Sequence, residues 1–167
     1  NCPFISVDYY GTQDSKGKMN LKSMQQTATD MYDWAKKEYP KAKIVIMGHS
    51  YGAGIAAYLS SVRETHSLII AAGYRDLSDL YNKIIPIFHG PLKVFISNNI
   101  QASKYAQNVS CPVYVIGSDA DKTLDASLQE KVAGCFNNSE IRIFKNINHE
   151  NYLITDEVLD YVKSKMK

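Results

Sequence analysis

The pentapeptide at residues 48–52 has the residue types and spacing of a reactive serine site. It reads Gly-His-Ser-Tyr-Gly and places Ser50 between two glycines, each two positions away. A serine in a tight turn sits at strained backbone angles, and nearby glycines avoid clashing with it. Such a turn exposes the hydroxyl as a nucleophile, and the next backbone N–H, that of Tyr51, can stabilise a negatively charged oxygen. The pentapeptide therefore predicts nucleophilic chemistry at Ser50, with Tyr51 as an oxyanion donor.

The sequence on either side strengthens this interpretation, because G-x-S-x-G alone is a weak signal. Residues 43–47 are apolar after their first lysine, which is typical of a central strand in a parallel sheet. Residues 53–62 are rich in small side chains and are expected to be helical. Strand, tight turn and helix in this order form the setting that a nucleophilic serine requires.

A serine hydroxyl is a poor nucleophile without a general base, and His149 is the strongest candidate for that base. It lies in the polar stretch 146–150, between the last expected strand and the last expected helix. A loop at that point can reach the carboxyl edge of an open sheet, where ligands bind. We expect His49 to pack or bond locally. His66 and His89 lie outside the loops that should border the serine.

An acidic residue should hold the histidine ring in the correct tautomer. In chain order it is expected between Ser50 and His149, just after a strand. The segment 113–123 supplies two candidates, Asp119 and Asp121. Asp121 is favoured, because the Lys-Thr-Leu run after it leads into the next helix as such loops usually do. Asp119 remains the alternative.

The remaining chain alternates between strand and helix patterns. Strands are expected at residues 4–8, 43–47, 68–72, 112–117 and 141–144, and helices at 21–39, 53–62, 125–135 and 155–165. This alternation predicts an α/β fold, a doubly wound parallel sheet of about five strands with flanking helices. Residues 1–167 are expected to form one domain. Residues 75–108 break the pattern, either as an irregular connection or as a small lid over the site.

Composition excludes several function classes. The chain of 167 residues is 45% hydrophobic and 22% charged, as in ordinary globular proteins. Its net charge of +2 comes from intermixed charges, so nucleic acid is not an expected partner. No apolar run approaches the roughly 20 residues of a membrane-spanning helix. The three cysteines lack CxxC spacing and the four histidines lack an HxxxH pair, so no metal or other cofactor is expected.

The chain resembles the α/β-hydrolase family. Ser50, Asp121 and His149 fall in the family's order Ser…Asp…His. Residues 8–15 are similar to its D-x-x-G-x-G-x-S loop, with glutamine in place of the second glycine. Residues 112–121 are similar to its P-V-x-V-x-G-x-x-D segment, with one extra residue before the acid.

A narrower resemblance is to the Bem46/dienelactone-hydrolase-like branch, carried by residues 72–77 and the short lid. The resemblance implies hydrolysis of a small-molecule carboxylic ester or thioester through an acyl-enzyme on Ser50, without a cofactor. Two alternatives remain open. One is a serine peptidase or lipase-like enzyme with the same three residues, and the other is a non-catalytic binding module derived from a hydrolase.

The resemblance also concerns the start of the chain. It implies about three strands before Phe4, and a His-Gly loop that donates a second oxyanion N–H. We therefore expect either that the chain is part of a longer gene product or that the site is half-built. A sheet without those strands would expose an unpaired edge at Phe4 to Val7, through which the chain is expected to self-associate.

Overall fold

The computed structural model describes residues 3–9, 15–76 and 100–167, which belong to two compact units. The first unit is Asn1–Ala42 and the second is Lys43–Lys167. All of the candidate site residues belong to the second unit. Most of the predicted lid, at residues 77–99, lies outside the described residues, so the lid and the single-domain organisation stay predictions.

The first unit contains one long helix, α1 (Leu21–Glu38). Asn20 caps its start: the Asn20 side chain accepts from the N–H of Ser23 at 3.0 Å, and the Ser23 hydroxyl accepts from the N–H of Asn20 at 3.0 Å. The strand predicted at residues 4–8 is wrong, because residues 3–9 have no regular secondary structure. An apolar run becomes a strand only when a partner strand takes its backbone hydrogen bonds, and the run itself does not specify that partner.

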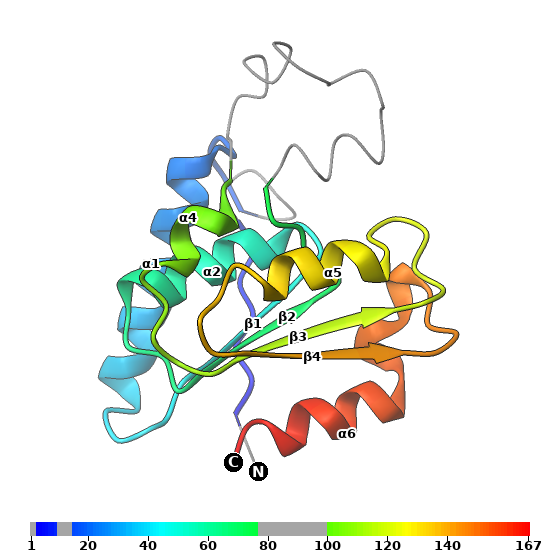
Figure 1. The fold of residues 1–167 in the computed structure, drawn as a ribbon. Helices are drawn as coiled ribbons and strands as arrows, with labels where there is room; N and C mark the ends of the chain where they lie inside the picture. Colours follow the sequence, from blue (N-terminus) through cyan, green and yellow to red (C-terminus); the bar gives the residue numbers. More distant parts are fainter. Residues whose placement is uncertain (1–2, 10–14, 77–99) are drawn as a thin grey trace. The chain divides into compact units, whose positions relative to one another are not determined.

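The second unit is built on a sheet of four parallel strands in the order β1-β2-β3-β4 (Figure 1). The strands are β1 (Val45–His49), β2 (Ser67–Ala71), β3 (Val113–Ser118) and β4 (Ser139–Phe144). The predicted α/β fold with a parallel sheet is confirmed, and the described residues form four of the about five strands expected. Every residue of the central strand β2 is buried, as its continuous apolar run predicts.

Helices cover both faces of this sheet. They are α2 (Gly52–Val62), α4 (Ala102–Ala106), α5 (Ala126–Ala133) and α6 (Asp156–Ser164), with a 3₁₀ helix, η2 (His149–Ile154), before α6. Right-handed crossovers between strands in sequential order place the connecting helices on one face. Figure 1 shows α2, α4 and α5 on that face and α6 on the other.

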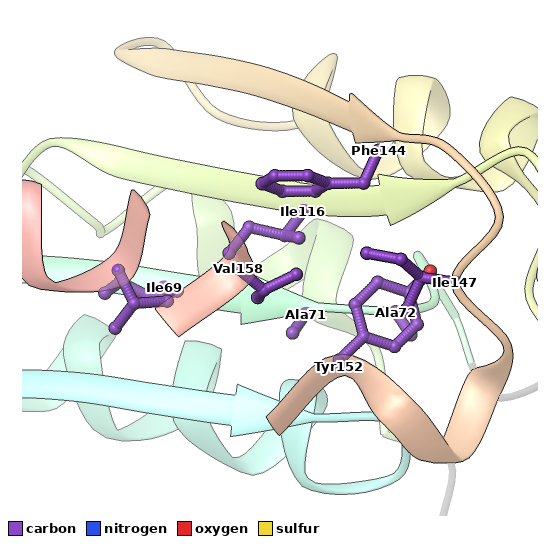
Figure 2. Close-up of a cluster of buried hydrophobic side chains, with 9 residues drawn as sticks. Ile69, Ala71, Ala72, Ile116, Phe144, Ile147, Tyr152 and Val158 are labelled. Atoms are coloured by element: carbon purple, nitrogen blue, oxygen red, sulfur yellow. The ribbon is translucent and has the colours of Figure 1, made fainter. Parts of the chain in front are cut away.

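Between α6 and the sheet lies a buried apolar cluster (Figure 2). Its members are Ile69, Ala71, Ala72, Ile116, Phe144, Ile147, Tyr152, Val158 and Val162. Tyr152 is the one member of this cluster whose side chain carries a polar atom. The cluster fixes η2 and α6 against the sheet, so the segment that follows the carboxyl end of β4 has a defined position.

Candidate active site

Ser50 lies in a tight turn between β1 and α2. Its φ of 51° is in the left-handed region, which is uncommon for a residue other than glycine. The surrounding backbone holds it there. The N–H of Ser50 donates to the carbonyl of Ala71 at 3.0 Å, and its own carbonyl accepts from the N–H of Ala53 at 3.0 Å. The turn is thus tied to β2 on one side and to the first turn of α2 on the other.

The two glycines that flank this turn are not equivalent. A Cβ atom on Gly48 would meet the Gly52 carbonyl oxygen at 2.6 Å and the Ala56 Cβ at 2.7 Å, whereas a Cβ on Gly52 would meet nothing within 4 Å. The expectation that both glycines avoid a clash is therefore right for Gly48 and wrong for Gly52. The reason is that β1 and α2 approach each other at Gly48, while Gly52 faces open space.

We predict that Gly48→Ala lowers the free energy of unfolding by about 1–3 kcal/mol, the usual cost of overpacking. The matched variant Gly52→Ala adds the same methyl group where there is room, and should change stability by less than about 1 kcal/mol. Urea unfolding of both variants measures the difference. Equal losses would contradict the close approach of β1 and α2 at Gly48.

His149 connects the Ser50 hydroxyl to the Asp121 carboxylate. Its Nε2 lies 2.8 Å from Ser50 Oγ, and its Nδ1 lies 2.9 Å from Asp121 Oδ2. Because a carboxylate only accepts, Nδ1 carries the proton and Nε2 accepts from the serine hydroxyl. The structure thus brings together three residues that the sequence places 99 and 28 positions apart. His149 is the first residue of η2, not a loop residue as the sequence suggested.

The Asp121 carboxylate is buried and holds four hydrogen bonds. Oδ1 accepts from the backbone N–H groups of Thr123 at 2.9 Å and Leu124 at 2.8 Å. Oδ2 accepts from His149 Nδ1 and from the Tyr152 hydroxyl, the latter at 3.2 Å. A buried charge is tolerated when its acceptor sites are filled in this way. Both Asp121 oxygens are therefore held in place by hydrogen bonds, and Oδ2 faces His149.

Asp119, the alternative acid, has a different place. It is exposed, and its Oδ1 accepts from the backbone N–H of Asn146 at 2.8 Å. Asn146 has a φ of 60°, so the carboxylate braces a strained turn after β4. Next to it, the buried Ser118 hydroxyl accepts from the N–H of Ile147 at 3.0 Å. Asp119 thus supports the turn that leads to His149 and does not face the histidine ring.

Tyr51 follows the serine as the N-cap residue of α2. Its carbonyl accepts from the Tyr74 hydroxyl at 3.0 Å. The first N–H groups of a helix lack acceptors within that helix and lie at the positive end of its dipole. This is the right location for an oxyanion donor, and that role of Tyr51 stays a prediction.

The neighbouring His49 contacts the candidate base directly. Its Nε2 lies 3.0 Å from the backbone oxygen of His149, and the two ring centroids are 5.2 Å apart. Burial, followed by repulsion from His149, lowers the pKa of His49. A neutral His49 donates its Nε2 proton to that carbonyl. The expectation of a local role thus holds, although the local partner is the base itself.

The other two histidines do not join the site in the described structure. His66 lies immediately before β2, at the opposite edge of the sheet, and its Nε2 bonds to the Lys167 backbone oxygen at 3.1 Å. His89 lies outside the described residues. Sequence reasoning overlooked Tyr152, for which the three-residue spacing from His149 was the available signal.

The described part of the chain contains neither a cluster of metal ligands nor a helix that could span a membrane. Within residues 3–9, 15–76 and 100–167, there is no cluster of three or more His, Cys, Asp or Glu side chains that could hold a metal ion. The helices described in those ranges are all too short or too polar to cross a bilayer.

The sequence is similar to known proteins with the α/β-hydrolase fold. A family model described as the alpha/beta hydrolase fold matches residues 2–73. The lysophosphatidylserine lipase ABHD12 of Xenopus tropicalis is 30% identical over 145 residues, which cover 77% of this chain and 37% of the relative. The alpha/beta hydrolase domain-containing protein aho-3 of Caenorhabditis elegans is 27% identical over 129 residues, 76% of this chain and 37% of the relative. The chain thus spans little more than a third of the length of these relatives.

Solved structures show the same fold. The esterase Pf2001 of Pyrococcus furiosus superposes with a TM-score of 0.73 at 20% identity, covering 95% of this chain and 66% of that one. Est1E of Butyrivibrio proteoclasticus, solved with ferulic acid bound, superposes with a TM-score of 0.72 at 14% identity, covering 95% of this chain and 75% of that one. With a matching family model, similar relatives and this shared fold, the chain belongs to the α/β-hydrolase superfamily.

Proposed function

We propose that the chain is a serine hydrolase that cleaves a carboxylic ester or thioester through an acyl-enzyme on Ser50. The observation that carries this proposal is the hydrogen-bond chain from Ser50 Oγ to His149 Nε2 and from His149 Nδ1 to Asp121 Oδ2, at 2.8 and 2.9 Å. A serine, a base and an acid that orients the base are the three parts that nucleophilic acyl transfer requires.

In the first half of the reaction, Ser50 Oγ attacks the substrate carbonyl carbon while its proton passes to His149 Nε2. The carbonyl oxygen becomes an oxyanion, which the backbone N–H of Tyr51 stabilises. His149 then gives the proton to the leaving alcohol or thiol, and the bond to the leaving group breaks. The acyl group is now an ester of Ser50.

In the second half, water replaces the leaving group. His149 Nε2 takes a proton from the attacking water, and the second tetrahedral intermediate expels Ser50 Oγ, which recovers that proton. The products are a carboxylic acid and free Ser50. In both halves the imidazolium of His149 forms beside the Asp121 carboxylate, which stabilises its positive charge. The neutral state of His49 supports this step, because it places no second positive charge next to the ring.

The relatives indicate which ester to test first. The curated relative from Xenopus tropicalis is named a lysophosphatidylserine lipase, and the superposed Pyrococcus furiosus protein is named an esterase. We therefore propose an acyl ester of a single-chain phospholipid as the substrate class, ahead of a peptide bond. The same three residues would serve a peptidase, so the substrate has to be decided by assay.

A fluorophosphonate probe tests the proposed nucleophile. The probe phosphonylates a serine, with loss of fluoride, when a neighbouring base activates the serine hydroxyl. We predict stoichiometric labelling of the 167-residue chain, located on Ser50 by peptide mass spectrometry and suppressed by prior incubation with lysophosphatidylserine. Heat-denatured protein is the control and should not react. Labelling of another residue, or none in the folded chain, would refute the proposal.

A further inference from the structure

The Tyr152 side chain contacts the same carboxylate oxygen as the candidate base. Its hydroxyl donates to Asp121 Oδ2 at 3.2 Å, and His149 Nδ1 lies 2.9 Å from that oxygen. Tyr152 is fully buried. A buried hydroxyl is costly unless it is hydrogen-bonded, and a phenylalanine would fill the same apolar space without that cost. The carboxylate contact therefore needs an explanation beyond packing.

The shared contact follows from the geometry of η2. A 3₁₀ helix has three residues per turn, so side chains at i and i+3 project from the same side. His149 and Tyr152 have that spacing within η2 (His149–Ile154). One short element thus delivers the imidazole and the phenol to one carboxylate oxygen. In an α-helix the same two side chains would be offset by about 60° around the axis, whereas the 3₁₀ geometry aligns them.

The surroundings keep the phenol in place and protonated. In Figure 2, the Tyr152 ring lies next to Ala72 and Ile147 in the buried cluster. Its centroid is 5.8 Å from that of His49. Burial, followed by the charge of Asp121, raises the pKa of Tyr152, so its hydroxyl remains a hydrogen-bond donor at neutral pH.

We propose that Tyr152 is a positioning residue for His149, acting through Asp121. Its hydroxyl takes up part of the charge on Oδ2, which limits how tightly the carboxylate holds the imidazolium. It also fixes the carboxylate rotamer, together with the N–H groups of Thr123 and Leu124 on Oδ1. The effect on turnover rests on the proposed function, whereas the effect on the His149–Asp121 hydrogen bond does not.

Tyr152→Phe removes only the hydroxyl, and Tyr161→Phe is the matched control. The Tyr161 hydroxyl also donates to a carboxylate, Glu140 Oε1 at 2.9 Å, on an exposed surface between α6 and β4. The ionisable groups near His149 that remain the same in both variants are Asp121, His49 and Glu150. A difference between the variants can therefore be assigned to the lost Tyr152–Asp121 bond.

The first measurement is the NMR signal of the His149 Nδ1 proton, assigned by its absence in His149→Gln. Without the competing donor, Asp121 Oδ2 should accept more strongly from Nδ1, and the signal should move downfield in Tyr152→Phe but not in Tyr161→Phe. An unchanged signal in a Tyr152→Phe protein that retains its near-UV circular dichroism would overturn the proposal.

The second measurement is the pH profile of ester hydrolysis. In Tyr152→Phe, kcat should fall about three- to tenfold with KM nearly unchanged, because orientation of the base matters mainly in the transition state. The acidic limb should move to higher pH, since the more strongly charged carboxylate retains the imidazolium. An unmoved limb would count against the proposal. If the wild-type chain hydrolyses no ester while the NMR signal still moves, the hydrolase function fails and the positioning role stands.

Discussion

Ser50→Ala should reduce ester hydrolysis by about 10⁶-fold, the size of the loss when the nucleophile of a serine enzyme is removed. The methyl group of alanine supplies no oxygen for the acyl-enzyme, so the covalent route closes completely. His149 and Asp121 would remain hydrogen-bonded to each other, yet the base would have no hydroxyl to activate. The measurement is kcat/KM for a short p-nitrophenyl ester, with fatty-acid release from lysophosphatidylserine as a second assay.

Ser61→Ala is the matched control for this loss. Ser61 lies on α2, the helix that begins just after the reactive turn, and its hydroxyl donates to the Tyr58 carbonyl. The Ser61→Ala variant makes the same chemical change on the helix that follows the reactive turn, and Ser61 is not hydrogen-bonded to His149. The activity of Ser61→Ala should stay within about twofold of the wild type. Ser61 is only partly buried, and substitutions outside the core and the active site usually have small effects. Comparable losses in both variants would show that a folding defect, and not the nucleophile, explains Ser50→Ala.

Periodicity predicted the second unit well because its elements carry their own signals. Residues 68–72 are continuously apolar, and β2 is buried along its whole length. Residues 155–165 have acids first and lysines last, as the macrodipole favours, and α6 begins at Asp156. In such segments, burial and helix-end chemistry are properties of the segment itself, so local reasoning is sufficient.

Features that depend on distant partners were not predictable in this way. Phe4 to Val7 has the residue types of a strand, but a strand also needs a neighbour, and none pairs with residues 3–9. The expected self-association through that segment stays a prediction. Likewise, the polar stretch 146–150 contains no pattern that predicts η2. This helix is held in place because Tyr152 packs in a cluster with residues of β2, β3 and β4.

The choice between Asp119 and Asp121 shows the same limit at the site. Both acids follow β3 within three residues, and chain order alone does not separate them. What separates them is direction: Asp121 is buried and faces His149, whereas Asp119 is exposed and bonds to the Asn146 N–H. Side-chain direction in an irregular loop depends on contacts from other segments, here η2 and the turn after β4.

Replacing Asp121 with asparagine should lower kcat by about 10⁴-fold, as a wrong histidine tautomer does in serine enzymes. The structure fixes which end of the new amide faces the base. Thr123 and Leu124 both donate N–H groups to the Oδ1 position, so the amide oxygen must occupy it. The NH₂ group is then left at the Oδ2 position, where it donates to His149 Nδ1. Nε2 would carry the proton and could no longer accept one from Ser50.

Asp119→Asn is the matched substitution two residues away, and it should leave kcat within about twofold of the wild type. The amide oxygen can accept the Asn146 N–H as the carboxylate does, so the turn before His149 keeps its bond. The measurement is kcat of both variants at the pH where the wild-type chain is most active, and both substitutions remove one negative charge. A larger loss in Asp119→Asn would mean that the turn after β4 controls the base more than the buried carboxylate does. The assignment of Asp121 as the acid that orients His149 would then have to be abandoned.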